Sequence, residues 1–257
     1  MRGQHRHAAS RLAAAGLRVE VFEDHPTPGT PVHCTGVFAA DAFDEFDLPR
    51  DAVLNELRTA RFLGPSGGTI EYTTPTLEAV VIDRAAFDSR LADRAARAGA
   101  RLTCGVRVLD VQVQSDRARL VLGDGAVTDA RTVVLACGAN YGLQRRLGLG
   151  MPASHLQSAQ LELPATRPGD VEVHFGADIA PKGFAWAVPV RRGDATFARI
   201  AATLSTGRDN ARFVLRLLRA QRATSQLPTP ARFVLELVRD ARRTHLVAFT
   251  MAGSTAN

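Results

Sequence analysis

The chain has 257 residues, of which 46% are hydrophobic and 23% charged, a composition typical of a globular protein with a sizeable core. This balance excludes a disordered or fibrous chain. The formal net charge is +6, but the basic residues are spread over the whole length and no aromatic and basic recognition motif accompanies them, so no nucleic-acid partner is expected.

The three cysteines are odd in number and widely spaced, which fits neither a disulfide framework nor a zinc site. No metal is therefore expected, and a reducing cytoplasm is the predicted compartment. The sequence also lacks a run of about 18 apolar residues, which a membrane-spanning helix needs.

The amino-terminal part predicts a helix, a strand and a loop in that order. Residues 8–16 have apolar residues at helical spacing and end in glycine, and residues 17–23 then alternate apolar and polar residues as a strand does. This order is typical of the second half of a β-α-β unit. A loop rich in proline and glycine follows at 25–31, and residues 56–82 predict short strands.

The middle of the chain predicts a helix followed by several strands. Residues 84–98 carry apolar side chains at helical spacing and precede a glycine. Strand patterns recur at 101–113 and 117–122, and the Asp-Gly pair after the second of these marks a hairpin. The apolar run 132–136 predicts a further, buried strand.

The second half predicts a more antiparallel sheet and then amphipathic helices. The expected strands are 155–163, 171–175, 184–190 and 195–204. Two arginine-rich amphipathic segments follow at 209–222 and 231–243, and residues 248–257 show neither a helical nor a strand period.

Five short motifs in these stretches form a recognisable series. They are the strand ending at Glu23, the segment Pro31–Gly36, the helix start Asp83-Arg84 with Phe87-Asp88 and Leu91, the segment Ala136–Tyr141, and the aromatic segment Gly183–Pro189. Together they resemble FAD-dependent oxidoreductases of the geranylgeranyl reductase family, which share the fold of the FAD-dependent aromatic hydroxylases. The resemblance covers roughly residues 8–205.

The resemblance implies FAD as the cofactor and names four contacts for it. Glu23 would accept hydrogen bonds from the ribose hydroxyls, Arg84 would bind a pyrophosphate or flavin oxygen, and Val108 would lie against the adenine through its backbone. Gly138 belongs to the second flavin-associated motif, in which many relatives carry Asp-Gly where this chain has Cys137-Gly138. From the residues alone, Glu23 is more readily interpreted as a solvent-facing acid at a strand end.

The resemblance also implies a pocket for the substrate or the flavin ring. Its residues would be Cys34, Thr35, Gly36, Phe184, Trp186 and Pro189. Large flat side chains suit a long apolar substrate, because they bury much area at low entropic cost. A cysteine buried in a loop and aromatic residues in the core of the second sheet remain the alternatives. No catalytic residue is assigned, since His33, the nearest histidine, is explained as well by solvation in its loop.

The implied fold is α/β (α+β), an incomplete Rossmann-like FAD-binding domain with an inserted, mostly antiparallel sheet. Residues 1–150 would form the partial FAD-binding domain, including a β-rich excursion near 55–82. Residues 151–205 would form the substrate-domain sheet, and 206–257 amphipathic helices and an irregular tail. Neither the family's Gly-x-Gly-x-x-Gly turn nor its later Gly-Asp-Ala-type segment is present, so we expect a chain truncated at both ends that binds FAD weakly or not at all.

The activity implied by the resemblance is reduction of carbon–carbon double bonds in an isoprenoid or related small apolar molecule, with NAD(P)H or another reductant as electron donor. An FAD-dependent aromatic monooxygenase is the alternative enzyme. A noncatalytic fragment of a flavoprotein is the alternative of another class. Peripheral membrane contact through the arginine-rich segments is a further alternative to their packing on the sheet.

Overall fold

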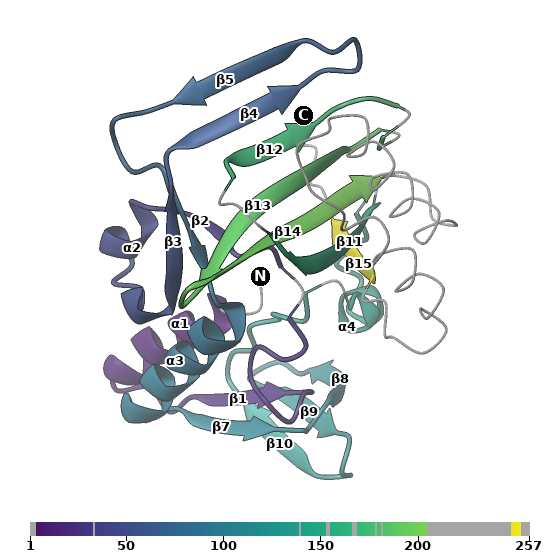
Figure 1. Ribbon diagram of the computed structural model, residues 1–257. Coiled ribbons are helices and arrows are strands. Elements are labelled where there is room, and N and C mark those ends of the chain that lie inside the picture. The colour runs from purple at the N-terminus through teal and green to yellow at the C-terminus, as the bar shows by residue number, and fades with distance from the viewer. Residues whose placement is uncertain are drawn as a thin grey trace. The chain divides into compact units, whose positions relative to one another are not determined.

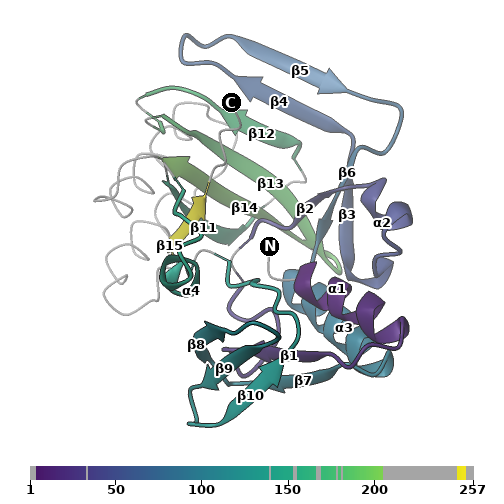
Figure 2. The same cartoon turned by 180° about the vertical axis from the view of Figure 1, so that it is seen from behind.

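The computed structural model describes residues 4–32, 34–138, 140–152, 155–165, 169–177, 179–180, 182–204 and 248–252. The chain divides into two compact units, and each is considered by itself below (Figures 1 and 2). The first unit comprises Met1–Val32, Pro49–Ala52 and Asp83–Met151, and the second comprises His33–Leu48, Val53–Ile82 and Pro152–Asn257. His33 and the segments 209–222 and 231–243 lie outside the described residues.

The first unit contains short helices, a parallel pair of strands and a small antiparallel sheet. Its elements are α1 (Gln4–Ala14), β1 (Glu20–Glu23), the 3-10 turn η1 (Arg50–Ala52), α3 (Arg84–Arg97), β7 (Arg101–Cys104), β8 (Val108–Val113), β9 (Ala118–Leu122), β10 (Val127–Ala130) and α4 (Gly142–Arg146). Helices α1 and α3 lie side by side in both views (Figures 1 and 2). Their contact is lined by Ala9, Ala13 and Ala95, whose small side chains let the helices approach closely.

Helix α3 follows from local signals in the sequence. The side chain of Asp83 accepts hydrogen bonds from the backbone N–H groups of Ala85 and Ala86, at 3.0 and 3.1 Å, and so caps the helix. Phe87 and Leu91 are buried one turn apart, and Gly99 follows the helix with φ of 99°. The helix predicted at 84–98 is therefore confirmed as Arg84–Arg97.

The strands of the first unit form two small sheets. Strand β1 pairs in parallel with β7, with Glu23 opposite Cys104, and β10, β9 and β8 form an antiparallel sheet in that order. The strand predicted at 132–136 is wrong: the structure assigns no strand there, and Val134 is 65% exposed. Val133 and Leu135 pack on the core beside β8 and β9, but an apolar run forms a strand only where another strand pairs with it.

The second unit contains two sheets. The smaller has the order β2-β6-β3, formed by β2 (Val37–Ala39), β6 (Ala79–Ile82) and β3 (Val53–Leu57), with the one-turn helix α2 (Ala42–Glu45) after β2. The larger has the order β15-β11-β14-β13-β12-β4-β5, formed by β15 (Ala248–Ala252), β11 (His155–Pro164), β14 (Ala195–Leu204), β13 (Phe184–Arg192), β12 (Val171–His174), β4 (Thr59–Leu63) and β5 (Thr69–Thr73). All neighbouring strands in the large sheet are antiparallel except β12 and β4.

The two sheets of the second unit share a hydrophobic core. Leu57 and Val81 from the small sheet pack against Val188 and Val190 of β13, and these residues are at most 8% exposed. The opposite face of the large sheet has its own cluster around Ala185 and other buried residues of β11 and β14. Both faces of the central strands are therefore covered, which explains why β13 and β14 are so rich in apolar and small residues.

The strands predicted from 155 to 204 are confirmed as β11, β12, β13 and β14. The irregular tail predicted at 248–257 is corrected in part, because residues 248–252 form β15, which pairs with β11. Backbone hydrogen bonds to a neighbouring strand do not require a side-chain period, so this short strand left no pattern in the sequence. Among the described residues, no helix is both long enough and apolar enough to cross a membrane.

Candidate functional site

Glu23, the predicted ribose contact, ends β1 and is only 8% exposed. Its Oε2 accepts a hydrogen bond from the Arg6 guanidinium at 2.5 Å, and Arg6 is itself 1% exposed. Its Oε1 accepts the backbone N–H of His25 at 3.1 Å and lies 2.7 Å from Nδ1 of the same residue. Glu23 is thus a buried, paired carboxylate rather than the solvent-facing acid of the alternative interpretation.

The neighbouring residues Asp24 and His25 complete a cluster of ionisable groups with Glu23. One ligand atom from each of the three lies within 4.8 Å of the others, a spacing that would suit a metal ion. However, the guanidinium of Arg6 places a positive charge directly on Glu23. Since a cation would be repelled there, we assign the cluster to ion pairing.

Arg84, the predicted pyrophosphate or flavin contact, begins α3 and is 6% exposed. Its NH2 group donates to both carboxylate oxygens of Asp88, at 3.0 and 2.8 Å, one helical turn later. The guanidinium also lies over the ring of Phe87, 5.8 Å from the centroid. Asp88 therefore fixes the orientation of Arg84.

The other two predicted cofactor contacts, Val108 and Gly138, also belong to the first unit, and both would contact the cofactor through their backbone. Val108 begins β8 and is partly buried against the core of the small antiparallel sheet. Gly138 is exposed and has φ of 60°, a conformation that favours glycine. Burial raises the pKa of the adjacent Cys137 thiol above its ordinary value. That thiol is therefore neutral at pH 7 and does not supply the negative charge of the aspartate that the resemblance implies at this position.

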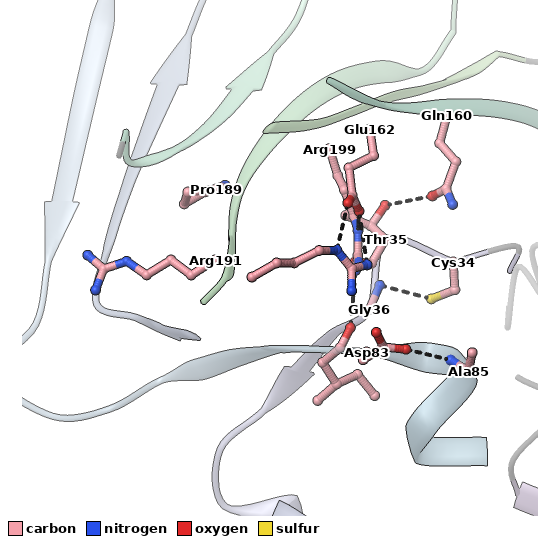
Figure 3. A network of polar contacts seen from close by, with 12 residues as sticks. Cys34, Thr35, Gly36, Asp83, Ala85, Gln160, Glu162, Pro189, Arg191 and Arg199 are labelled. Atoms are coloured by element: carbon pink, nitrogen blue, oxygen red, sulfur yellow. Dashed lines mark hydrogen bonds and ion pairs between the residues drawn. The ribbon is translucent and has the colours of Figure 1, made fainter. Parts of the chain in front are cut away.

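The predicted pocket residues Thr35 and Trp186 are brought together in the second unit, although 151 positions separate them in the chain. The indole Nε1–H of Trp186 donates to the Thr35 hydroxyl at 2.8 Å, and that hydroxyl lies 3.4 Å from Oε1 of Gln160. Cys34 is half-buried beside them, and its Sγ accepts the backbone N–H of Gly36 at 3.4 Å (Figure 3). The structure thus joins two motifs that the sequence could only name separately.

Phe184 lies on the same strand as Trp186 and forms an aromatic row with it. The ring centroids of Phe184 and Trp186 are 5.2 Å apart, and Phe175 lies 6.2 Å from Phe184 on the other side. Phe184 and Phe175 are 38% and 41% exposed. Trp186 packs partly on the core formed with Val188, as the core alternative expects, whereas the two exposed phenylalanine rings are open to an apolar ligand.

Pro189, the last predicted pocket residue, lies within β13, whose register with β14 runs through it without a break. The side chain of Asn55 from β3 binds the backbone of β13 at this point. Its Nδ2 donates to the carbonyl of Pro189 at 3.1 Å, and its Oδ1 accepts the N–H of Arg191 at 3.2 Å. Pro189 therefore has a structural role at the junction of the two sheets.

Arg199 is a site residue that the sequence interpretation missed. It lies on β14, is 4% exposed, and its Nε donates to Oε2 of Glu162 at 2.6 Å. Its NH1 donates to the backbone carbonyls of Thr35 and Ile82, at 2.6 and 3.1 Å (Figure 3). The one available signal was a single arginine inside the otherwise apolar and small-residue strand 195–204.

The partner of Arg199, Glu162, is also held by Arg192, whose Nε lies 2.8 Å from Oε1. Burial alone would raise the pKa of Glu162, but hydrogen bonds and charge attraction from Arg192 and Arg199 outweigh it, so the pKa lies below its ordinary value. Glu162 is therefore ionised at neutral pH, and its pair with Arg199 is fully charged.

Within the first unit, Glu23 has the residue type and the place in the fold that a ribose contact of FAD needs. Glu23 is a buried carboxylate at the end of a strand that follows a helix, which is where a ribose acceptor is needed. Because Arg6 already occupies Oε2, a ribose hydroxyl and the guanidinium would compete for that oxygen. The first turn of α1 carries His5, Arg6 and His7, near the position at which the resemblance leads one to expect a glycine-rich turn.

Comparisons with known proteins give relatives by sequence, although no family model matches the chain. Digeranylgeranylglycerophospholipid reductase 2 of Methanothermobacter thermautotrophicus is 29% identical in an alignment of 208 positions that covers 73% of this chain and 52% of that protein. The corresponding reductase of Methanocaldococcus jannaschii is 27% identical in an alignment of 193 positions that covers 71% of this chain and 49% of that protein. The chain thus spans about half the length of the curated relatives it matches.

Solved structures share the fold. A geranylgeranyl bacteriochlorophyll reductase-like protein from Thermoplasma acidophilum superposes with a TM-score of 0.76 at 22% identity, over 95% of this chain and 62% of that protein. The halogenase PltM, solved with phloroglucinol and FAD, superposes with a TM-score of 0.66 at 14% identity, over 95% of this chain and 56% of that protein. The predicted α/β (α+β) fold class is confirmed by these neighbours. The predicted resemblance to FAD-dependent oxidoreductases of the geranylgeranyl reductase family is likewise confirmed by the sequence relatives.

Proposed function

We propose that this chain is part of an FAD-dependent oxidoreductase that reduces carbon–carbon double bonds of an isoprenoid or related apolar molecule. The observation that carries the proposal is the hydrogen bond from Trp186 to Thr35, which joins the two motifs assigned to the pocket. The names of the curated relatives, which are digeranylgeranylglycerophospholipid reductases, support the same substrate class.

In this proposal each compact unit binds a different molecule. The first would hold FAD through Glu23, Arg84, Val108 and the backbone at Gly138, and the second would hold the substrate through the Cys34–Gly36 segment and the strand from Phe184 to Pro189. When bound and reduced, FAD supplies a hydride, and a proton completes addition across the double bond. NAD(P)H or another cytoplasmic reductant would regenerate the reduced cofactor.

Product analysis tests the proposal directly. The chain is incubated without oxygen with FAD, dithionite and a digeranylgeranylglycerophospholipid, and the lipid is analysed by mass spectrometry. We expect the lipid to gain one H2 for each double bond reduced, because hydride and proton both end on carbon. The control reaction contains the lipid, FAD and dithionite but omits the chain.

Two results would contradict the proposal. One is a folded chain that adds no hydrogen beyond the control, which would favour a noncatalytic fragment. The other is incorporation of an oxygen atom into an aromatic substrate in the presence of NADPH and air, which would favour the aromatic monooxygenase.

A further inference from the structure

Arg199 is a buried cation that joins three separate segments of the second unit. Its guanidinium reaches Glu162 on β11, Thr35 in the segment before β2, and Ile82 at the end of β6. A buried charge is costly unless it is paired and hydrogen-bonded, and here the three acceptors satisfy that requirement. The planar guanidinium serves them from two nitrogens held at a fixed spacing, Nε and NH1, whereas lysine carries its three donors on one nitrogen at the end of a flexible stem.

Two of the three acceptors, the carbonyls of Thr35 and Ile82, hold the backbone of the Cys34–Gly36 segment in place. The carbonyl of Thr35 is bound directly, and Ile82, whose carbonyl is also bound, donates its own N–H to the carbonyl of Gly36 at 2.8 Å. Gly36 has φ of 80°, so the backbone turns sharply at this point. Arg199 therefore holds both residues that follow Cys34, one directly and one through Ile82.

The side chain of Thr35 is held from the same sheet. Trp186 on β13 donates to its hydroxyl, and that hydroxyl lies within reach of Gln160 on β11. Three adjacent strands, β11, β14 and β13, thus each contribute one side chain to Thr35.

We propose that Arg199 is a positioning residue, which fixes the Cys34–Gly36 segment against the strand that carries Trp186. This inference rests on the proposed function, in which these two elements line the pocket. Glu162 orients the guanidinium, and it stays paired with Arg192 when Arg199 is replaced. Substitution of Arg199 therefore frees the segment without leaving the partly exposed Glu162 carboxylate unpaired.

Two readouts test the proposal without cofactor or substrate. Trp186 is the only tryptophan of the chain, so intrinsic fluorescence reports its surroundings alone. In a background in which Cys104 and Cys137 are replaced by serine, the rate of reaction with a soluble disulfide reagent reports access to Cys34. Both are measured on the full chain with its circular dichroism recorded alongside.

The test variants are Arg199→Met and Arg199→Lys, the second in case the first does not fold. We expect a red-shifted Trp186 emission and a roughly tenfold faster reaction of Cys34, because loss of a charged hydrogen bond favours opening of the segment. The matched control is Arg192→Met, which also removes a partner of Glu162 but is bonded to neither Thr35 nor Ile82. It should leave both readouts unchanged.

The proposal is overturned if Arg199→Met or Arg199→Lys folds and only loses stability, with Trp186 emission and Cys34 reactivity as in the wild type. It is also overturned if Arg192→Met changes both readouts equally. A wild-type chain without reductase activity would contradict the proposed function instead, since neither readout depends on turnover.

Discussion

Replacement of Asp88 by alanine is expected to lower the free energy of unfolding by about 3 kcal/mol, because removing one partner of a buried ion pair costs roughly 3–5 kcal/mol. Asp88 and Arg84 are exposed by only 3% and 7% of their side chains, and the Asp88 carboxylate accepts two contacts from the guanidinium. Urea unfolding followed by far-ultraviolet circular dichroism measures the change.

Two further variants distinguish the effect of losing the ion pair from the effect of any substitution in helix α3. Asp93→Ala removes an exposed carboxylate from the same helix and should change stability by less than about 0.5 kcal/mol. The double variant Arg84→Met with Asp88→Leu should recover most of the loss, because apolar residues of similar volume avoid the cost of burying charge. If Asp88→Ala costs no more than Asp93→Ala, the pair does not orient Arg84 as described.

The substitution Gly183→Ala is expected to destabilise the second unit by about 3 kcal/mol, at the upper end of overpacking effects. Gly183 directly precedes β13, and a Cβ atom there would lie 1.9 Å from the carbonyl oxygen of Thr203 on β14. That oxygen belongs to the backbone, so it cannot rotate away, and the start of β13 must shift.

Thermal unfolding and Trp186 fluorescence measure this effect together, since Trp186 lies three residues after Gly183. Gly169→Ala is the matched control, because a Cβ at Gly169 would meet no atom within 4 Å. It should leave the melting temperature and the emission unchanged. Equal stability of the two variants would show that β13 and β14 do not approach as closely as the structure places them.

The parts of the fold that were predicted from sequence depend on local signals. Helix α3 has its cap at Asp83, its apolar period and its terminal glycine within one stretch of chain. The strands β11 to β14 have strand-length apolar patterns bounded by turns. Strand pairing is not local, which is why the parallel contact of β12 with β4 was not foreseen and why the run 132–136 was wrongly assigned a strand.

In the candidate site too, residues within motifs could be predicted from the sequence, whereas the contacts between them could not. Glu23 and Trp186 could be named because each lies in a motif, but nothing in the motifs indicates what contacts them. Arg6 pairs with Glu23 across 17 positions, and Arg199 reaches Thr35 across 164. Such contacts depend on which face of a strand or helix is buried, and that is decided by the assembled sheets rather than by the sequence nearby.

The most direct test of the whole account is an equilibrium titration of the purified chain with FAD, read by the change in flavin fluorescence on binding. We predict weak but saturable binding that Glu23→Gln weakens further, at least about tenfold, because an amide is a poorer acceptor of ribose hydroxyls than a carboxylate. Glu20→Gln, on the same strand but exposed, should bind as the wild type does. A folded chain that gives no saturable change in flavin fluorescence would contradict the assignment of the first unit to the cofactor.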